Sequence, residues 1–289
     1  MKDAIMIRSY PESTEITMAL RPILHPLFQQ LQEGISEFAF ANIYLFRDVH
    51  NYRISKIGDE LFVITGNDND KPFFMLPFGL PEKQMLDMLF EHYSVMKAAT
   101  LKQAEQLAQL GYEIFEDRDN FDYLYSREEL AKLAGRKFHK KKNLVNAFIN
   151  NYNYEGKPLL KEYIPETIQV LERWRNGRDN PADYHANKEA LEKSEALQLC
   201  GGIYYVEGEP AAFTLGEELA RGESFVIHFE KALGKYKGIY QFVNKCFASI
   251  LPEKYKYINR EQDLGNPGMR QAKMSYRPVG FVKKYRATR

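Results

Sequence analysis

Residues 201–250 read GGIYYVEGEPAAFTLGEELARGESFVIHFEKALGKYKGIYQFVNKCFASI, and the order of elements in them predicts the fold class of the chain. Their first part holds two runs of β-branched and aromatic residues, at 202–206 and 211–215, separated by Glu-Gly-Glu-Pro at 207–210. Such runs on either side of a short turn-forming segment predict a β-hairpin. A further apolar run at 224–229 predicts the next strand.

An amphipathic helix is expected after a loop at 232–238 that is rich in Gly and Lys. Apolar side chains then recur at the spacing of one helix face, because an α-helix repeats every 3.6 residues. They are Ile239, Phe242, Val243, Cys246, Phe247 and Ile250. Hairpin, strand, loop and helix in this order predict a mixed central sheet flanked by helices, an α/β fold of the α+β type.

The chain before this stretch shows a similar order of elements, without a visible sequence repeat. Strands are expected at 41–46, 52–57, 61–65 and 73–77 because these runs are rich in β-branched and aromatic residues. The segment 150–156 is polar and turn-prone, so we place the boundary between the two halves near it. We therefore expect an N-terminal domain at 1–150 and a C-terminal domain at 151–289 that carries the active site.

The composition is that of a globular protein. Of the 289 residues, 44% are hydrophobic and 27% are charged, which argues against a disordered or fibrous chain. No apolar run approaches the ~20 residues of a membrane-spanning helix, and the N-terminus lacks the apolar segment of a signal peptide. Cys200 and Cys246 offer neither a metal-binding spacing nor a disulfide framework. We therefore expect a cytoplasmic protein without a transmembrane segment or a metal site.

Charge is distributed unevenly along the chain. Residues 1–120 hold 11 Lys and Arg against 18 Asp and Glu, a net charge of −7, whereas residues 121–289 hold 29 against 21, a net charge of +8. A basic half can attract an anionic partner. Lys137, Lys140 and Lys141 belong to a basic run and would share one helix face. We expect them to bind tRNA phosphates, although such lysines also commonly solvate an exposed face.

The loop at 232–238 is a candidate phosphate site, because the backbone N–H groups at a helix start lack partners and the helix dipole is positive there. Lys235 and Lys237 would add charge, and Gly238 would allow the backbone to approach a ligand closely. We expect these three residues to hold a phosphate of the donor substrate. The alternative is that the segment is an ordinary strand-to-helix turn.

Candidate catalytic side chains lie just before this loop. Glu230 ends the strand and could orient or deprotonate a nucleophile, or it could be an exposed strand-end charge. His228 lies two residues earlier and would face the same side of the strand, either as a second base or as a structural histidine. Asn259, Glu261 and Asp263 alternate at the end of a later strand. They would line a substrate site or form a polar turn.

Several stretches together resemble a known family. The strand and helix order resembles the GNAT acyltransferase fold, in which the loop before the helix holds the pyrophosphate of acyl-coenzyme A; here that loop reads KYKGIY at 235–240. The longer stretches are SEFAFANIY at 36–44, PFG at 77–79, DYLY at 122–125, GRKFHKKKN at 135–143, NREQDLG at 259–265 and GMRQAK at 268–273. They are similar to the C-terminal domain of phosphatidylglycerol lysyltransferase, and the similarity covers nearly the whole chain.

The resemblance implies two tandem GNAT-like domains, each a mixed sheet flanked by helices. It also implies transfer of an acyl or aminoacyl group, from aminoacyl-tRNA in the family, to an amine or hydroxyl on a small-molecule, lipid or peptide acceptor, with no tightly bound cofactor. Where the lysyltransferases carry Asp-Leu-Met-Arg, this chain reads Glu230-Lys231-Ala232-Leu233, which keeps the carboxylate. Two alternatives stay open: an N-acetyltransferase that uses acyl-coenzyme A, and a non-catalytic module that binds RNA or peptide on the same fold.

Overall fold

The computed structural model describes residues 6–176 and 183–289, which form two compact units. The first unit contains the described residues up to Asp122 together with Val282–Arg289, and the second contains Tyr123–Phe281. The chain thus divides near residue 122 and not near residue 150, where the sequence suggested a boundary. The reason is that the segment between these two positions joins the second sheet, and the last residues return to the first unit.

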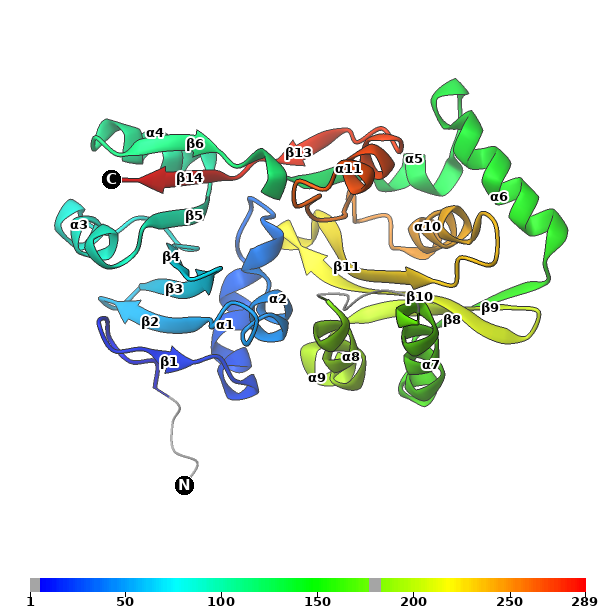
Figure 1. Cartoon of the computed structure of the whole chain (residues 1–289), viewed down its shortest axis with the longest axis horizontal. Helices are drawn as coiled ribbons and strands as arrows, with labels where there is room; N and C mark the ends of the chain where they lie inside the picture. Colours follow the sequence, from blue (N-terminus) through cyan, green and yellow to red (C-terminus); the bar gives the residue numbers. More distant parts are fainter. Residues whose placement is uncertain (1–5, 177–182) are drawn as a thin grey trace. The chain divides into compact units, whose positions relative to one another are not determined.

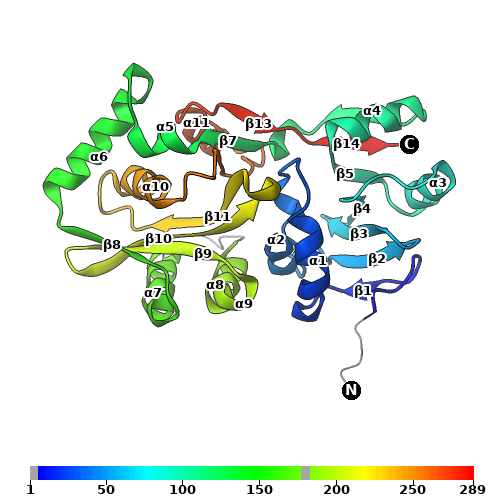
Figure 2. The ribbon, with the colours of Figure 1, turned by 180° about the vertical axis from the view of Figure 1, so that it is seen from behind.

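The first unit is built on a seven-stranded mixed sheet with the order β1-β2-β3-β4-β5-β14-β6. Its neighbouring strands are antiparallel except for β4 and β5, which run parallel. The strands are β1 (Thr14–Glu15), β2 (Arg53–Ile57), β3 (Leu61–Asp68), β4 (Lys71–Met75), β5 (Val95–Ala99), β6 (Glu113–Glu116) and β14 (Tyr285–Thr288). Figure 2 shows β14, the end of the chain, beside β5, so a strand from the C-terminus completes the first sheet.

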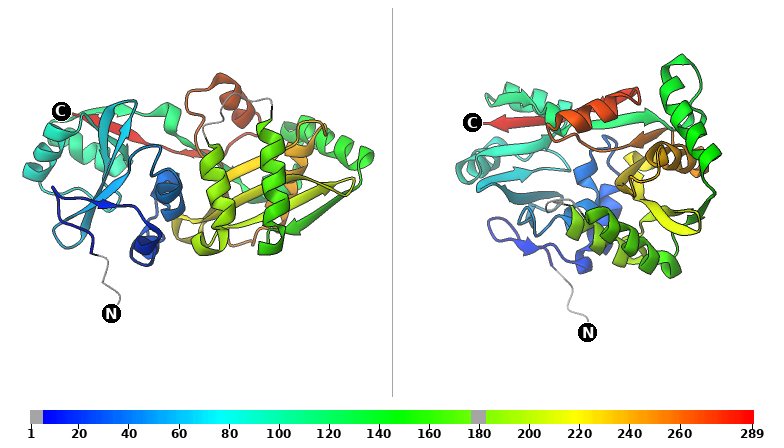
Figure 3. Two further views of the ribbon diagram at one scale, coloured as in Figure 1. Left: turned by 60° about the horizontal axis from the view of Figure 1, so that its bottom comes forward. Right: turned by 45° about the vertical axis from the view of Figure 1, so that its right-hand side comes forward.

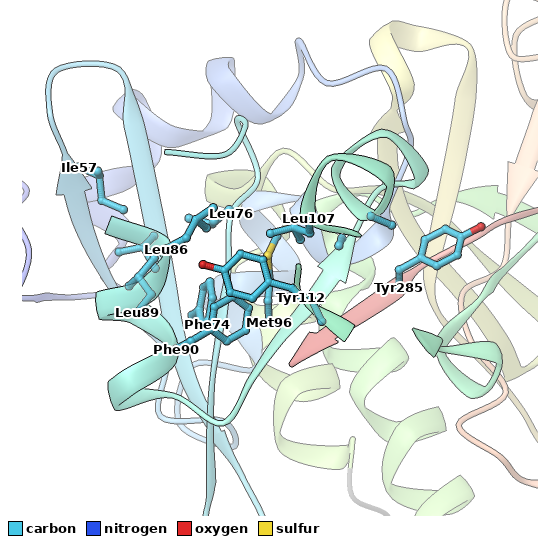
Figure 4. Close-up of a cluster of buried hydrophobic side chains, with 14 residues drawn as sticks. Ile57, Phe74, Leu76, Leu86, Leu89, Phe90, Met96, Leu107, Tyr112 and Tyr285 are labelled. Atoms are coloured by element: carbon cyan, nitrogen blue, oxygen red, sulfur yellow. The ribbon is translucent and has the colours of Figure 1, made fainter. Parts of the chain in front are cut away.

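The described residues of the first unit form the helices α1 (Arg21–Phe28), α2 (Phe40–Leu45), α3 (Lys83–His92) and α4 (Leu101–Gln109). The helix α4 begins at a capping box, in which Thr100 and Gln103 each bond the other's backbone N–H. Apolar side chains of α3 and α4 pack with those of the sheet in one buried cluster (Figure 4). Phe74, Leu86, Met96 and Leu107 lie within it, so the amphipathic faces of these helices form the core of the unit.

The second unit has its own seven-stranded sheet, with the order β13-β7-β12-β11-β10-β9-β8. The expected hairpin is present as β9 and β10, and β11 pairs antiparallel with β10 and parallel with β12. The strands are β7 (Asp122–Ser126), β8 (Tyr154–Pro158), β9 (Cys200–Val206), β10 (Glu209–Leu219), β11 (Ser224–Ala232), β12 (Tyr257–Asn259) and β13 (Gly280–Val282).

Helices cover both faces of this second sheet. Figure 1 and the left view of Figure 3 show α7 and α8 against one face and α10 against the other. Phe242 of α10 stacks on Phe148 of α6, with ring centroids 4.5 Å apart. The helices of the unit are α5 (Arg127–Lys132), α6 (His139–Asn151), α7 (Ile164–Arg175), α8 (Tyr184–Glu192), α9 (Ser194–Leu197), α10 (Ile239–Ile250) and α11 (Pro267–Met274). Short 3-10 turns of the two units lie at Met18–Leu20, Ser36–Phe38, Arg118–Asn120, Arg136–Phe138, Lys161–Tyr163 and Ala220–Gly222.

The strand expected at 41–46 is wrong, because most of this segment forms the helix α2. All six residues of α2 are buried. A short run that is apolar on every side has no periodicity that distinguishes a helix from a strand, and its composition favoured the strand. The expected strands at 52–57, 61–65 and 73–77 correspond to β2, β3 and β4.

A buried ion-pair cluster ties the end of the chain to the first unit. Lys284 is 1% exposed, and its ammonium group bonds Glu37 and, at 2.7 Å, Asp122. Asp122 also accepts hydrogen bonds from the backbone N–H and the hydroxyl of Ser36, at 2.9 Å each. Because buried charges are costly without partners, this cluster constrains how β14 can enter the sheet.

Replacing Lys284 with Ala should destabilise the protein by about 3–5 kcal/mol, because Glu37 and Asp122 would stay buried without their cation. Urea denaturation of both forms measures this difference. The matched control is Lys283→Ala, since Lys283 pairs with Glu116 at 2.9 Å with both side chains half exposed. Equal effects of the two substitutions would contradict a structural role of the buried cluster.

Candidate functional site

The candidate site lies where β11 separates from β12. The two strands pair only from Ser224 to Val226 on β11, opposite Tyr257–Asn259. From there to Ala232, β11 stays paired with β10 on its other side but not with β12. At the same place the pairing of β11 with β10 shifts register, because Gly216 pairs with Ile227 while Leu215 pairs with Phe229. This bulge adds one residue to β11 and bends the strand. Side chains, not backbone hydrogen bonds, therefore connect the end of β11 to the segment after β12.

Glu230 lies in this gap with its carboxylate 8% exposed. Its Oε1 accepts a hydrogen bond of 2.7 Å from the guanidinium of Arg260, the first residue after β12. Its Oε2 is buried and, among the described residues, has no hydrogen-bond partner. Glu230 is thus a buried carboxylate with one oxygen held by a cation and the other available, rather than an exposed strand-end charge.

Two further unpartnered oxygens lie close to Glu230. Thr214 of β10 is the register partner of both Glu230 and Gly202, so the three residues lie on one rung across the sheet. Directly paired side chains have Cβ atoms about 5 Å apart. The hydroxyl of Tyr204 lies over Gly202, 3.2 Å from where its Cβ would be. Within the described part of the chain, the hydroxyls of Thr214 and Tyr204 are buried without hydrogen-bond partners.

The electrostatics of the site reflect burial and the charge of Glu230. Burial is the main cause that raises the pKa of the Tyr204 hydroxyl, and the negative charge of Glu230 adds to it. Burial also raises the pKa of Tyr276 to about 12, with Arg260 opposing and Glu230 adding to the shift. Arg260 lies 5.5 Å from the Tyr276 ring. At neutral pH both phenols are therefore protonated and able to donate hydrogen bonds.

His228 is held on both sides and does not share the partners of Glu230. Its Nδ1 lies 2.8 Å from Glu261 and its Nε2 lies 3.0 Å from Glu217. Burial alone would lower the pKa of His228, but the hydrogen bonds and charges of Glu217 and Glu261 outweigh it and raise the pKa to about 10. His228 and Glu230 both reach the segment after β12, where His228 contacts Glu261 and Glu230 contacts Arg260. Both ring nitrogens are engaged, so the geometry fits the structural alternative for His228.

The segment after β12 is fixed by its own polar contacts. Asn259 is fully buried, and its side-chain oxygen accepts from the N–H of Glu261 at 2.8 Å. Lys273 of α11 donates to the carbonyl oxygens of Arg260, Glu261 and Gln262. These bonds determine where Arg260 and Glu261 present their side chains. Of the expected residues, Glu261 thus contacts His228, while Asn259 supports the backbone.

Asp263 likewise has a supporting role. It is fully buried and accepts hydrogen bonds from the Tyr123 hydroxyl at 2.5 Å, the Gly265 N–H at 2.9 Å and the guanidinium of Arg270 at 2.7 Å. Burial acts to raise the pKa of Asp263, but these hydrogen bonds, that of Arg270 first, hold it well below its usual range. Sequence reasoning missed Arg260 and Tyr204, although Arg260 lies within the NREQDLG stretch that signalled the family resemblance.

The loop before α10 packs against α6 through Gly238 and carries two lysines at the surface. Gly238 has φ of 90°, and a Cβ there would lie 2.4 Å from the carbonyl oxygen of Leu144, so the glycine permits close packing against α6. Lys235 is 57% exposed and lies 3.5 Å from Glu209. Lys237 is exposed. The structure therefore gives Gly238 a packing function and leaves the two lysines accessible at the surface.

The basic run occupies two elements. Lys137 lies in the 3-10 turn Arg136–Phe138 and bonds Glu129 at 2.5 Å, whereas Lys140 and Lys141 begin α6. Lys140 is exposed. Lys141 is half buried, with its ammonium 4.0 Å from the centroid of the Tyr276 ring. The three lysines do not form one helix face, and Lys141 lies next to the residues around Arg260.

Neither a metal cluster nor a membrane span is found in the described ranges. Among these residues, no group of three or more His, Cys, Asp or Glu side chains is arranged to hold a metal ion. No described helix combines the length and apolar character needed to cross a bilayer. A surface hollow of about 400 Å³ is lined by Lys157, Tyr163 and Tyr205, among others, and Glu230 is not part of its lining.

The pairing of His228 predicts a pH dependence of stability. Because its folded pKa of about 10 exceeds the ordinary value of 6.5, the stabilisation from its proton is complete below pH 6.5 and is lost as the pH rises through 10. The difference in unfolding free energy between the native protein and His228→Gln should therefore shrink over this interval. Denaturation at pH 6, 8 and 10 measures it. A difference that stays constant would show that His228 is not a paired imidazolium.

Comparison with known proteins agrees with the observed architecture. The model of the family "Phosphatidylglycerol lysyltransferase, C-terminal" matches residues 28–288. A conserved protein of unknown function from Bacteroides thetaiotaomicron VPI-5482 is 32% identical, with 98% of this chain and 99% of that chain covered and a TM-score of 0.87. L-PGS from Bacillus licheniformis shares the fold at 16% identity, with 99% and 94% covered and a TM-score of 0.63.

An uncharacterized protein from Mycoplasmoides gallisepticum is 25% identical over 184 residues, which are 60% of this chain and 56% of that protein. The chain thus spans little more than half the length of this relative. The two mixed sheets flanked by helices confirm the expected α/β class, with two tandem units that each have a sheet and helices. Since the family model matches most of the chain, this protein belongs to the family of the phosphatidylglycerol lysyltransferase C-terminal domain.

Proposed function

We propose that this protein is an aminoacyltransferase that moves an aminoacyl group from aminoacyl-tRNA to an amine or hydroxyl. The observation that carries the proposal is the free Oε2 of Glu230, a buried carboxylate oxygen beside the unpartnered hydroxyls of Tyr204 and Thr214. Buried polar atoms without partners are rare in folded proteins, and a substrate group is one explanation of such atoms. Family membership supports transfer of this kind.

The chemistry assigned to Glu230 is proton transfer and positioning. Its Oε2 would accept the proton of the attacking amine or hydroxyl, while Arg260 holds Oε1. The nucleophile then forms a new bond to the aminoacyl carbonyl carbon, and the ester bond to the tRNA ribose breaks. The proton that Glu230 has taken up leaves with the ribose oxygen, so the carboxylate is restored.

The other expected residues take supporting parts in this proposal. His228, through Glu261 and Glu217, fixes the segment that presents Arg260. Lys137, Lys140 and Lys141 would contact tRNA phosphates, and the exposed Lys235 and Lys237 remain available to a donor phosphate. The acceptor is proposed only as an amine or hydroxyl, which a small molecule, a lipid or a peptide could supply. We also propose that the protein is cytoplasmic.

An acyl-coenzyme A donor has less support. In the GNAT fold the loop before the helix holds the pyrophosphate, and here Gly238 of that loop is packed against the backbone of α6. The next position but one is Tyr240, whose hydroxyl bonds the backbone of Ala232 at the end of β11. These contacts use the loop for packing within the protein.

Replacing Glu230 with Gln should reduce the rate of transfer by about 100-fold or more, because the amide cannot take up a proton. The assay follows radiolabelled amino acids from bulk charged tRNA into lipid, peptide and small-molecule fractions of a cell extract. Binding of charged tRNA should not weaken, since the substitution keeps the shape of the side chain and removes only a negative charge.

The matched control is Glu223→Gln, which makes the same change at an exposed carboxylate paired with Lys256 at 2.7 Å. It should transfer at the native rate. Full activity of Glu230→Gln would remove the assigned role. Tight binding of charged tRNA by the native protein with no transfer into any fraction would favour the non-catalytic module instead.

A further inference from the structure

Lys141 is a half-buried cation without a counter-charge. Its ammonium lies 4.0 Å from the centroid of the Tyr276 ring, which is itself 6% exposed. In the described part of the chain no carboxylate pairs with Lys141, unlike Lys137, which is bonded to Glu129. Burial is the main cause that lowers the pKa of Lys141, and the positive charge of Arg260 lowers it further. The charged form of Lys141 is therefore disfavoured both by the loss of solvation and by a neighbouring positive charge.

Arg260 is the second cation on the same ring, with its guanidinium carbon 5.5 Å from the Tyr276 centroid. The hydroxyl of Tyr276, whose pKa is raised by burial, lies near Arg260 and Gln241 of α10, both of which act to lower that pKa. Glu230 pairs with Arg260 at 2.7 Å and is therefore already engaged. The two cations Lys141 and Arg260 and the one carboxylate of Glu230 leave a net positive charge. Polar side chains from α6, from α10 and from the segment after β12 come together here.

An anion would satisfy this arrangement. Lysine and arginine together recognise phosphate, one as a point charge and the other as a planar fork of donors. The residues that flank Lys141 on α6, Lys140 and Lys142, are exposed lysines for which the described structure contains no ion pair. Because an α-helix turns by about 100° per residue, Lys140 and Lys142 point to either side of Lys141 and surround it with positive charge. Such added charge attracts a phosphodiester backbone more strongly than a single free phosphate, since a backbone carries many charges.

We infer that Lys141, Arg260 and Tyr276 form a subsite for one phosphate of an RNA backbone, next to Glu230. The inference rests on the proposed function and makes it more specific, because it places a single backbone phosphate of the donor RNA beside the carboxylate. Lys140 and Lys142, which point to either side of Lys141 around α6, then add charge that attracts the rest of the backbone. Lys141 acts as a binding residue in this arrangement and Arg260 serves both the phosphate and Glu230.

The first test measures inorganic phosphate alone. Thermal unfolding of the whole chain is followed in phosphate and in chloride at equal ionic strength, since a ligand of the native state raises the unfolding midpoint. Phosphate should raise the midpoint of the native protein, and Lys141→Gln should weaken the apparent phosphate affinity about tenfold or more. The control is Lys102→Gln on α4, an exposed lysine of the first unit, which should respond to phosphate as the native protein does.

The second test measures binding of uncharged bulk tRNA against salt concentration. Lys141→Gln should weaken binding and reduce the slope of log affinity against log salt by about one. Loss of phosphate response and of tRNA affinity in Lys141→Gln supports the subsite even if no transfer is detected. Transfer that depends on Glu230, with phosphate and tRNA binding both unchanged by Lys141→Gln, overturns the subsite and leaves the proposed function. Lys141-dependent binding to phosphatidylglycerol vesicles without an effect on tRNA also overturns it, in favour of a lipid headgroup.

Discussion

The separation of β11 from β12 is the constraint on which the rest of the second unit depends. The parallel pairing stops at Val226 and Asn259, and the bulge near Ile227 bends β11 away. Backbone groups on this side of β11 no longer bond to β12 and need other partners. In the gap between the two strands, side chains contact one another. The pairs Glu230–Arg260 and His228–Glu261 bridge it at 2.7 and 2.8 Å.

This arrangement explains why so many charged groups are buried in one region. Buried ions are tolerated when ion-pair partners and hydrogen bonds replace water. Each charged side chain at the gap has such a partner, although single oxygen atoms there have none within the described part of the chain. Asp263 and Lys273 fix the chain after β12, so Arg260 and Glu261 reach across without having to be ordered by a substrate. Near the gap, Oε2 of Glu230 and the hydroxyls of Tyr204 and Thr214 stay unsatisfied by any described residue, and they mark where a ligand group can bind.

The sequence predicted the elements that rest on local patterns. The hairpin β9–β10 and the helix α10 followed from turn residues and helical spacing, and Glu230 was predicted as a candidate from its place before the loop. Other features depend on partners far along the chain. The helix α2 has no informative periodicity. The strand β14 pairs with β5, which lies almost two hundred residues before it in the sequence. The bulge arises from the register between β11 and β10. The periodicity along β11 alone does not reveal that register, so the sequence did not indicate the separate partners of His228 and Glu230.

The most direct test of the account is a binding titration of the purified protein with bulk charged tRNA and, separately, with acetyl-coenzyme A, at low and moderate salt. Charged tRNA should bind saturably and more weakly as salt increases, because lysines on α6 are proposed to contact its phosphates. Acetyl-coenzyme A should show no saturable binding. Saturable binding of acetyl-coenzyme A that weakens in Lys235→Ala, with no binding of tRNA, would contradict the account and identify the loop before α10 as the donor site.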